Sequence, residues 1–170
     1  MKASRPGVTL VETAIGVALL GTAVLVLSAL FSAGMKAYNY GMRQTLVLYQ
    51  ARRALFGEGW RQGMLPAAMG ASTAASLDAA KLDLVCGGSG LQYYSDGSVL
   101  LRATAGGALE QAKAATALQV DYYNLDSAGT IIVSTAPASA LMATALLQFQ
   151  TRGQSRNYKF FSGAGMRNHP

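Results

Sequence analysis

The chain has 170 residues, of which 51% are hydrophobic and 13% are charged, and its formal net charge at pH 7 is +6. Its single cysteine, Cys86, excludes an intramolecular disulfide, and its single histidine, His169, argues against a histidine-based zinc site or catalytic triad. The carboxylates lack metal-loop spacing, and neither a phosphate-binding glycine motif nor a nucleophile elbow occurs. We therefore expect no enzyme, no metal and no cofactor.

A long apolar segment begins close to the N-terminus. After Glu12 no charged residue occurs until Lys36. As a helix, the uncharged residues 13–35 would span about 35 Å, which is enough for the roughly 30 Å hydrocarbon core of a bilayer. Lys2 and Arg5 precede the run, which favours a cytoplasmic N-terminus. This segment predicts one membrane-spanning helix.

Glu12 is the unusual residue of this segment, because a carboxylate inside a membrane helix is costly and marks a functional site by default. One interpretation is a secretory signal peptide cut near Ser32-Ala33-Gly34, but the apolar part of such a peptide is only about 7–15 residues long. A second is a plain membrane anchor whose Glu12 side chain reaches the headgroups. A third rests on the residues around Glu12.

The string GVTLVE at residues 7–12, preceded by a short basic leader, resembles the class III signal sequence of type IV pilins and type II secretion pseudopilins. In that family a membrane peptidase cuts after the glycine, and the new N-terminus is methylated. The resemblance implies cleavage between Gly7 and Val8, N-methylation of Val8, and Glu12 as the fifth mature residue. Val8 is a departure, because the family usually has Phe there.

The physics of a buried charge agrees with this resemblance. Cleavage would create a positive α-amino group on Val8 at the membrane edge. In a filament, the Glu12 carboxylate of one subunit would pair with the amine of a neighbour, since low dielectric strengthens the attraction and penalises an unpaired charge. Only a correctly staggered subunit would relieve that penalty, so we expect Val8 and Glu12 to set the register.

Beyond the membrane segment, apolar residues at alternating spacings of four and three predict that the helix continues to about Phe56. We expect this amphipathic extension to pack on a sheet. The alternative is a free amphipathic segment that lies on the membrane surface. The residues expected on the packing face are Leu48, Tyr49, Ala51 and Leu55.

The pattern then changes from helix to strand. Residues 63–80 predict a connecting loop with a short helical turn, and residues 106–116 predict either a loop or a short helix. Residues 141–150 fit a helix by their alanines and a strand by their alternation, and we predict a strand. Asp96-Gly97 and residues 126–129 mark two hairpin turns. The other predicted strands are 82–86, 91–94, 99–102, 118–123, 130–133 and 157–162.

We therefore predict an α+β fold in which a long N-terminal helix packs on an antiparallel β-sheet, as in pilins. Its parts are a leader (1–7), a transmembrane and filament-core helix (8–35), an amphipathic extension (36–60) and a globular head (61–170). The head resembles J-type minor pseudopilins and W-type minor pilins. The residues that carry this second resemblance are Tyr94, Asp96, Gly97, Leu100 and Arg102, followed by the Tyr-Tyr-Asn string at 122–124 and Arg-Asn at 167–168.

Basic residues gather near the C-terminus with no acidic residue among them, and aromatic residues interleave with them. A solvated face, a surface complementary to an acidic face of the next subunit, and a nucleic-acid site are the three interpretations that we consider. No recognition motif accompanies the charge, which disfavours nucleic acid. The candidate basic patch consists of Arg152, Arg156, Lys159 and Arg167.

The resemblance implies a minor pilin or pseudopilin that acts in priming, assembly or tip formation of a type IV pilus or a type II secretion filament. Its implied partners are other pilin-like subunits, a prepilin peptidase and methyltransferase, an inner-membrane assembly platform and membrane lipid. We expect a single-pass protein of the bacterial inner membrane that later joins a periplasmic filament or a surface pilus. The alternative is a membrane-anchored adhesin or DNA-uptake receptor that does not polymerise.

Overall fold

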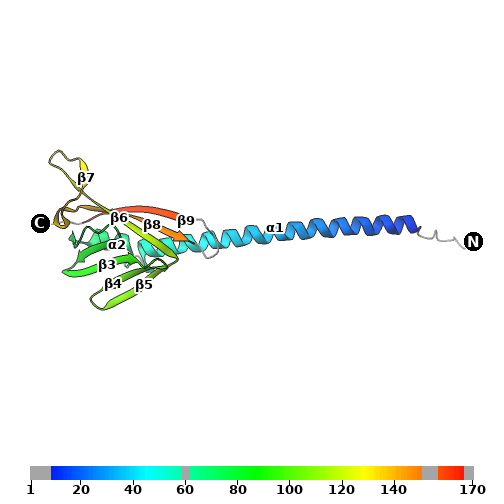
Figure 1. The fold of residues 1–170 in the computed structure, drawn as a ribbon, viewed down its shortest axis with the longest axis horizontal. Helices are drawn as coiled ribbons and strands as arrows, with labels where there is room; N and C mark the ends of the chain where they lie inside the picture. Colours follow the sequence, from blue (N-terminus) through cyan, green and yellow to red (C-terminus); the bar gives the residue numbers. More distant parts are fainter. Residues whose placement is uncertain (1–8, 59–61, 151–156, 167–170) are drawn as a thin grey trace, which may run out of the picture. The chain divides into compact units, whose positions relative to one another are not determined.

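The protein is α+β in a computed structural model, with one long N-terminal helix and two antiparallel sheets (Figure 1). The structure describes residues 9–58, 62–150 and 157–166. The chain divides into two compact units, Met1–Arg43 and Gln44–Pro170. The second unit contains both sheets and the end of the helix.

Helix α1 spans Leu10–Phe56 and has 47 residues, so the predicted continuation to Phe56 is confirmed. It ends where Gly57 adopts a φ of +75°, a left-handed conformation that disfavours side chains. The Gly57 N–H donates to the Arg53 carbonyl at 2.8 Å and closes the last turn.

The end of α1 packs within the second unit through a face of small side chains. Val47, Gln50, Ala51 and Ala54 are buried, and they follow the i, i+3, i+4, i+7 spacing of one helix face. The alternative of a free amphipathic segment is therefore wrong for these residues.

The predicted packing face is correct at Ala51 and at Leu55, which is partly buried against the core. It is wrong at Leu48 and Tyr49, whose exposed fractions are 54% and 58%. These two residues lie one and two positions after Val47, so the helix rotates them by about 100° and 200° from the buried line. The spacing of the apolar residues suggested that both are buried, whereas the line that is buried includes the small residues Ala51 and Ala54.

A short helix and a five-stranded sheet follow. Helix α2 (Met64–Gly70) and strand β1 (Thr73–Ala74) occupy the segment predicted as a connecting loop with one helical turn. The sheet has the order β1-β2-β3-β4-β5, with β2 at Lys81–Cys86, β3 at Ser89–Ser95, β4 at Val99–Thr104 and β5 at Gly107–Lys113.

The hairpin at Asp96-Gly97 is confirmed by the antiparallel pairing of β3 with β4 and by a φ of +93° at Gly97. The prediction of a loop or short helix over residues 106–116 is wrong, because β5 and the start of β6 occupy this segment. Its sequence has no clear alternation, and the pairing of β5 with β4 decides its conformation.

The second sheet has four strands in the order β7-β6-β8-β9. Its strands are β6 (Ala115–Leu125), β7 (Ile131–Val133), β8 (Met142–Gln150) and β9 (Asn157–Gly165), with a 3-10 turn at Pro137–Ser139 before β8. The strand predicted over residues 141–150 is confirmed. The prediction of a single sheet is wrong. The first sheet ends with β5, and the next strand, β6, pairs with β7 and β8 in a second sheet.

Tyr122 on β6 ties the second sheet to the first. Its hydroxyl accepts the Asp83 N–H at 3.0 Å and donates to the Lys81 carbonyl at 3.1 Å. The Val120 N–H donates to the Ala79 carbonyl at 2.9 Å beside it. The largest fully buried side chains come from α1, α2 and both sheets: Tyr93, Phe149, Met64, Leu84, Leu100, Leu147, Val47 and Val120.

Candidate functional site

The start of α1 is a reciprocal capping arrangement between Thr9 and Glu12. Thr9 lies immediately before the helix, and its hydroxyl oxygen accepts the Glu12 N–H at 3.3 Å. The Glu12 Oε2 atom in turn accepts the Thr9 N–H at 2.9 Å and the Thr9 hydroxyl at 3.1 Å. This is the capping box, in which N-cap and N3 side chains satisfy each other's free backbone donors. The negative charge also complements the positive end of the helix dipole.

The sequence interpretation missed this local role of Glu12. The sequence does contain the pattern that predicts this role, since Thr-x-x-Glu at residues 9–12, before an apolar run, is the capping-box pattern. Glu12 therefore has a hydrogen-bonding partner in its own chain, which lowers the cost of its carboxylate. All three contacts use Oε2 or the Glu12 backbone, so Oε1 has no donor among the residues that the structure describes.

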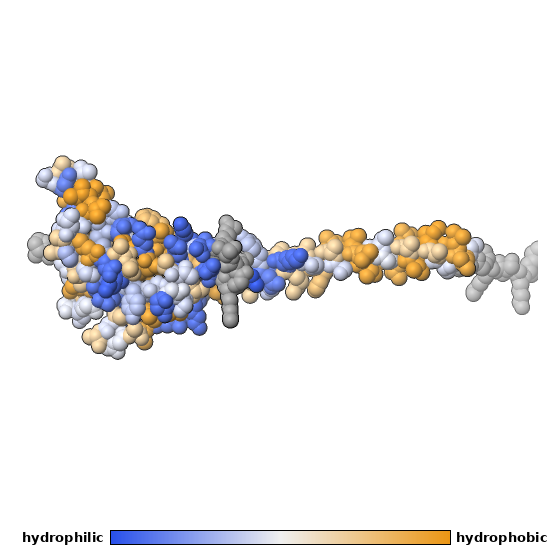
Figure 2. Space-filling model, in the orientation of Figure 1, coloured by the Kyte–Doolittle hydropathy of each residue, from blue (hydrophilic) through white to orange (hydrophobic). Residues whose placement is uncertain are grey.

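An extensive apolar surface follows this cap. Every residue from Thr9 to Leu46 is exposed, and hydrophobic residues cover much of this part of α1 (Figure 2). Helix α1 is long and apolar enough to cross a membrane. Soluble proteins rarely expose contiguous apolar surfaces of this extent, so this part of α1 is compatible with a membrane-spanning segment. Its large exposed side chains include Leu10, Val11, Ile15, Val17, Leu19, Leu20, Val24, Leu25, Leu27, Leu30 and Phe31.

Gly7 and Val8, the predicted cleavage and methylation residues, lie outside the described part of the chain. The expectations about cleavage, methylation and the Val8–Glu12 pair therefore stay predictions. Arg152, Arg156 and Arg167 of the candidate basic patch also lie outside it, whereas Lys159 is exposed on β9.

The aromatic residues near Lys159 do not form one exposed stacking surface. Phe160 is partly buried and contacts Phe149 edge-to-face, with ring centroids 5.6 Å apart. Tyr158 is also partly buried against the core, whereas Phe161 is 71% exposed. Because single-stranded nucleic acid needs exposed aromatic faces, this alternation weakens the nucleic-acid interpretation.

Two buried glutamines hold the end of α1 to strand β5. The Gln50 Oε1 atom accepts the Lys113 N–H at 2.9 Å, and the Gln111 Nε2 atom donates to the Arg53 carbonyl at 3.1 Å. Their exposed fractions are 8% and 7%, so loss of either partner would leave a buried polar group unsatisfied. The Gln50–Lys113 partners lie 63 residues apart and the Gln111–Arg53 partners 58, and no local sequence signal identifies either pair.

Among the described residues, no three His, Cys, Asp or Glu side chains lie close enough to hold a metal ion. Cys86 is partly buried, and burial raises the pKa of its thiol. A raised pKa lowers the fraction of reactive thiolate, so the geometry around Cys86 does not favour nucleophilic chemistry.

The fold and this site define an α+β protein with a capped N-terminal helix that is long and apolar enough to cross a membrane. Comparisons of the chain with family models, with curated proteins and with solved structures found no match in any of the three.

Proposed function

We propose that this protein is a minor pilin or pseudopilin, of the kind that primes, assembles or terminates a type IV pilus or a type II secretion filament. The observation that carries the proposal is the capped Glu12 at the start of an apolar helix whose far end packs into a separate head. The leader string at residues 7–12 supports it, as does the layout of one long helix followed by antiparallel hairpins.

The exposed apolar surface of α1 serves two successive environments in this proposal. In the precursor, lipid covers the segment and holds the protein in the inner membrane with its N-terminus in the cytoplasm. In the filament, the apolar helices of other pilin-like subunits replace the lipid. Both coverings remove apolar area from water, so the same side chains suit both states.

Glu12 selects the register of assembly in this proposal. Cleavage after Gly7 by a prepilin peptidase leaves a positive amine on Val8, one residue before the cap. The capping box occupies Oε2 of Glu12, and Oε1 is the atom that receives the amine of a neighbouring subunit. A charge-assisted hydrogen bond in a low-dielectric environment makes this contact stronger than an ordinary one.

Mass spectrometry of the protein from its native membrane tests the proposal. The expected N-terminus is a methylated Val8, and the protein is expected in purified filaments together with other pilin-like chains and an assembly platform. An N-terminus at Met1, or one after Gly34, would contradict it. A chain cut after Gly7 that never enters filaments would instead support the membrane-anchored adhesin or receptor.

A further inference from the structure

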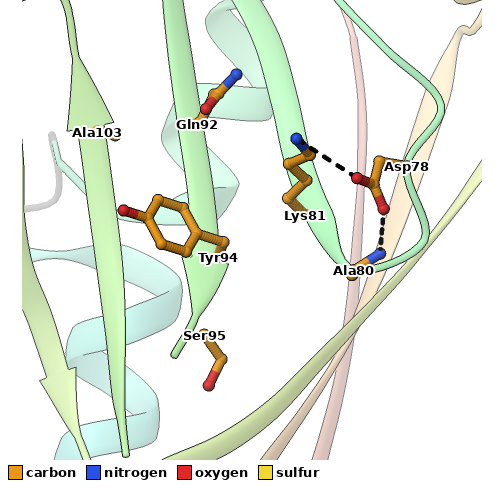
Figure 3. Close-up of a pocket in the computed structure, with 7 residues that line it drawn as sticks. All are labelled: Asp78, Ala80, Lys81, Gln92, Tyr94, Ser95 and Ala103. Atoms are coloured by element: carbon orange, nitrogen blue, oxygen red, sulfur yellow. Dashed lines mark hydrogen bonds and ion pairs between the residues drawn. The ribbon is translucent and has the colours of Figure 1, made fainter. Parts of the chain in front are cut away.

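The outward face of the five-stranded sheet contains a shallow groove that the filament role does not use. Its larger part has a volume of about 440 Å³ and is lined by Asp78, Ala80, Lys81, Gln92, Tyr94, Ser95 and Ala103 (Figure 3). A second hollow of about 320 Å³ shares Gln92 and Ala103 with it and continues to Thr104 and Ala105. The two hollows are adjacent over strands β3 and β4, and we call them together the β3–β4 groove.

The strand register explains why these side chains share one face. Gln92 pairs with Ala103 across β3 and β4, and Tyr94 pairs with Lys81 across β3 and β2. Alternate residues of a strand point to the same face, so Gln92 and Tyr94 lie about 6.6 Å apart along β3. The small side chain of Ala103 leaves the hollow open, and the Tyr94 phenol points from β3 toward β4 (Figure 3).

A buried carboxylate orients the polar centre of the groove. Asp83 is only 7% exposed, and its Oδ2 atom accepts the Ser76 hydroxyl at 2.8 Å and the Gln92 Nε2 at 3.2 Å. The Ser76 hydroxyl orients the Asp83 carboxylate, and the carboxylate holds the Gln92 amide with its Oε1 atom remaining as an acceptor. The groove thus has a preorganised hydrogen-bonding group beside an aromatic ring.

The charges of the groove cancel locally. The Lys81 Nζ atom lies 3.5 Å from Asp78 Oδ2, and Asp78 Oδ1 accepts the Ala80 N–H at 2.8 Å. The remaining residues of its lining are uncharged. This lining therefore disfavours an anionic chain such as nucleic acid, which requires unpaired cations. The groove also runs over the sheet face, where the backbone is already paired, so it does not suit strand addition by a peptide.

We propose that the β3–β4 groove binds a neutral, linear oligosaccharide. A pyranose ring has an apolar C–H face that packs on an aromatic side chain, and hydroxyls that both donate and accept hydrogen bonds. Tyr94 supplies the aromatic surface, and Gln92 with Asp78 supplies acceptors. The two adjacent hollows lie on either side of the Gln92–Ala103 pair, which favours a chain of several sugar units over a monosaccharide. This binding is independent of whether the protein polymerises.

Titration calorimetry of the full-length protein in a detergent without a sugar headgroup tests the proposal. The probes are cellohexaose and chitohexaose, which represent an external glucan and an amino-sugar chain of cell-wall type. An open, shallow site predicts a Kd of about 0.05–1 mM for at least one probe. We expect Tyr94→Ala to weaken binding about tenfold or more, and Tyr94→Phe to weaken it less than about threefold, because the ring remains.

Tyr49→Ala is the matched control, because Tyr49 is an exposed tyrosine outside the groove. Gln92→Leu has a similar size but no acceptor, and we expect it to weaken binding about fivefold to tenfold. Circular dichroism of each variant establishes that it is folded. Two results would overturn the proposal: neither probe binds wild type at about 5 mM, or a folded Tyr94→Ala variant binds within twofold of wild type.

Discussion

At the scale of single residues, Glu12 combines two roles that different substitutions separate. Its capping role needs an acceptor at the third helical position, which Gln also provides. Its proposed pairing role needs a negative charge. Thr9 contributes to the cap and has no charge, so it has no part in the proposed pairing.

We expect Glu12→Gln to keep membrane insertion and the cap but to reduce incorporation into filaments about tenfold or more, because a buried pair that loses one charge leaves the other uncompensated. Thr9→Ala should keep incorporation within about threefold, since the loss of an N-cap costs only about 1 kcal/mol. Immunoblots of sheared filaments and of membranes measure both quantities, and mass spectrometry checks leader cleavage in each variant. Normal incorporation of Glu12→Gln would remove the pairing role, and an equal defect in Thr9→Ala would assign Glu12 to capping.

Tyr93 is a second residue whose environment has a measurable consequence. Its side chain is fully buried, and its hydroxyl donates to the Gln62 carbonyl at 2.8 Å. Burial raises the pKa of Tyr93 to about 12, and burial also raises the pKa of Tyr122 to about 12. In the unfolded chain both tyrosines ionise near pH 10.

Because the pKa of each tyrosine is higher in the folded state, its neutral form contributes to the stability of the fold. This contribution is complete below about pH 10 and falls as the pH rises toward 12. We expect the free energy of unfolding of the head to fall by about 2–3 kcal/mol over this range through Tyr93, with a smaller further decrease through Tyr122. The Tyr93→Phe variant should lose about 1–2 kcal/mol of its free energy of unfolding at pH 8, because the Gln62 and Gly63 carbonyls lose their hydrogen-bond donor. Its free energy of unfolding should also decrease less than that of wild type as the pH rises. Chemical unfolding at several pH values, with Tyr49→Phe as an exposed control, measures both effects. An alkaline decrease as large as that of wild type would contradict the assignment to Tyr93.

At the scale of elements, the end of α1 shows how a helix face is chosen by fit rather than by residue size. The buried line consists of Val47, Gln50, Ala51 and Ala54, and two of these are alanines. Small side chains occupy half of this line, and the hydrogen bonds of Gln50 and Gln111 satisfy backbone groups of β5 and α1. Larger side chains, Leu48 and Tyr49, remain outside.

We expect Ala54→Leu to destabilise the head by about 1–3 kcal/mol, because its side chain is completely buried and added methylene groups overpack the contact. Leu48→Ala should change stability by less than about 0.5 kcal/mol, because Leu48 is more than half exposed. Denaturant unfolding monitored by circular dichroism measures both. A larger loss for Leu48→Ala than for Ala54→Leu would restore the face predicted from the sequence.

The strands show which elements a sequence can predict. The β3–β4 hairpin was predicted because Asp96-Gly97 is a turn signal, and Asp96 Oδ1 accepts the Ser98 and Val99 N–H groups at 2.9 Å. These bonds lower the pKa of Asp96 and involve only neighbouring residues. Strand β5 was not predicted, because its conformation depends on pairing with β4. In this pairing Arg102 of β4 lies opposite Leu109 of β5.

At the scale of the whole molecule, the two units differ in how much apolar surface their described residues bury. Every buried hydrophobic residue among those that the structure describes lies between Val47 and Met166, within the second unit. Residues 9–43 of the first unit are exposed and largely apolar. Among the described residues, the core that stabilises the head is therefore separate from the exposed apolar surface of α1.

We expect a fragment of residues 44–170 to be soluble without detergent and to unfold cooperatively, with a Tm within a few degrees of the head in the full chain. The full chain should require detergent or lipid because of its exposed apolar helix. Thermal unfolding and size-exclusion chromatography of both proteins provide the measurement. Aggregation of the fragment, or a transition without cooperativity, would show that residues before Gln44 contribute to the core.

The sequence by itself determined the features that depend on near neighbours. These are the length and polarity of α1, the turn at Asp96-Gly97 and the strand at residues 141–150. The Thr-x-x-Glu pattern of the cap also stands in the sequence, although its role was recognised only from the hydrogen bonds between Thr9 and Glu12. Each depends on a periodicity or a hydrogen bond within a few residues, so local order is sufficient to identify it.

Only the tertiary structure decided how the strands divide into two sheets, which face of α1 is buried, and that Asp83 orients Gln92 in the β3–β4 groove. These features depend on contacts between residues that are distant along the chain or on different strands. Pairing and close packing select among several locally acceptable arrangements, and the selected partner is not encoded in any short segment.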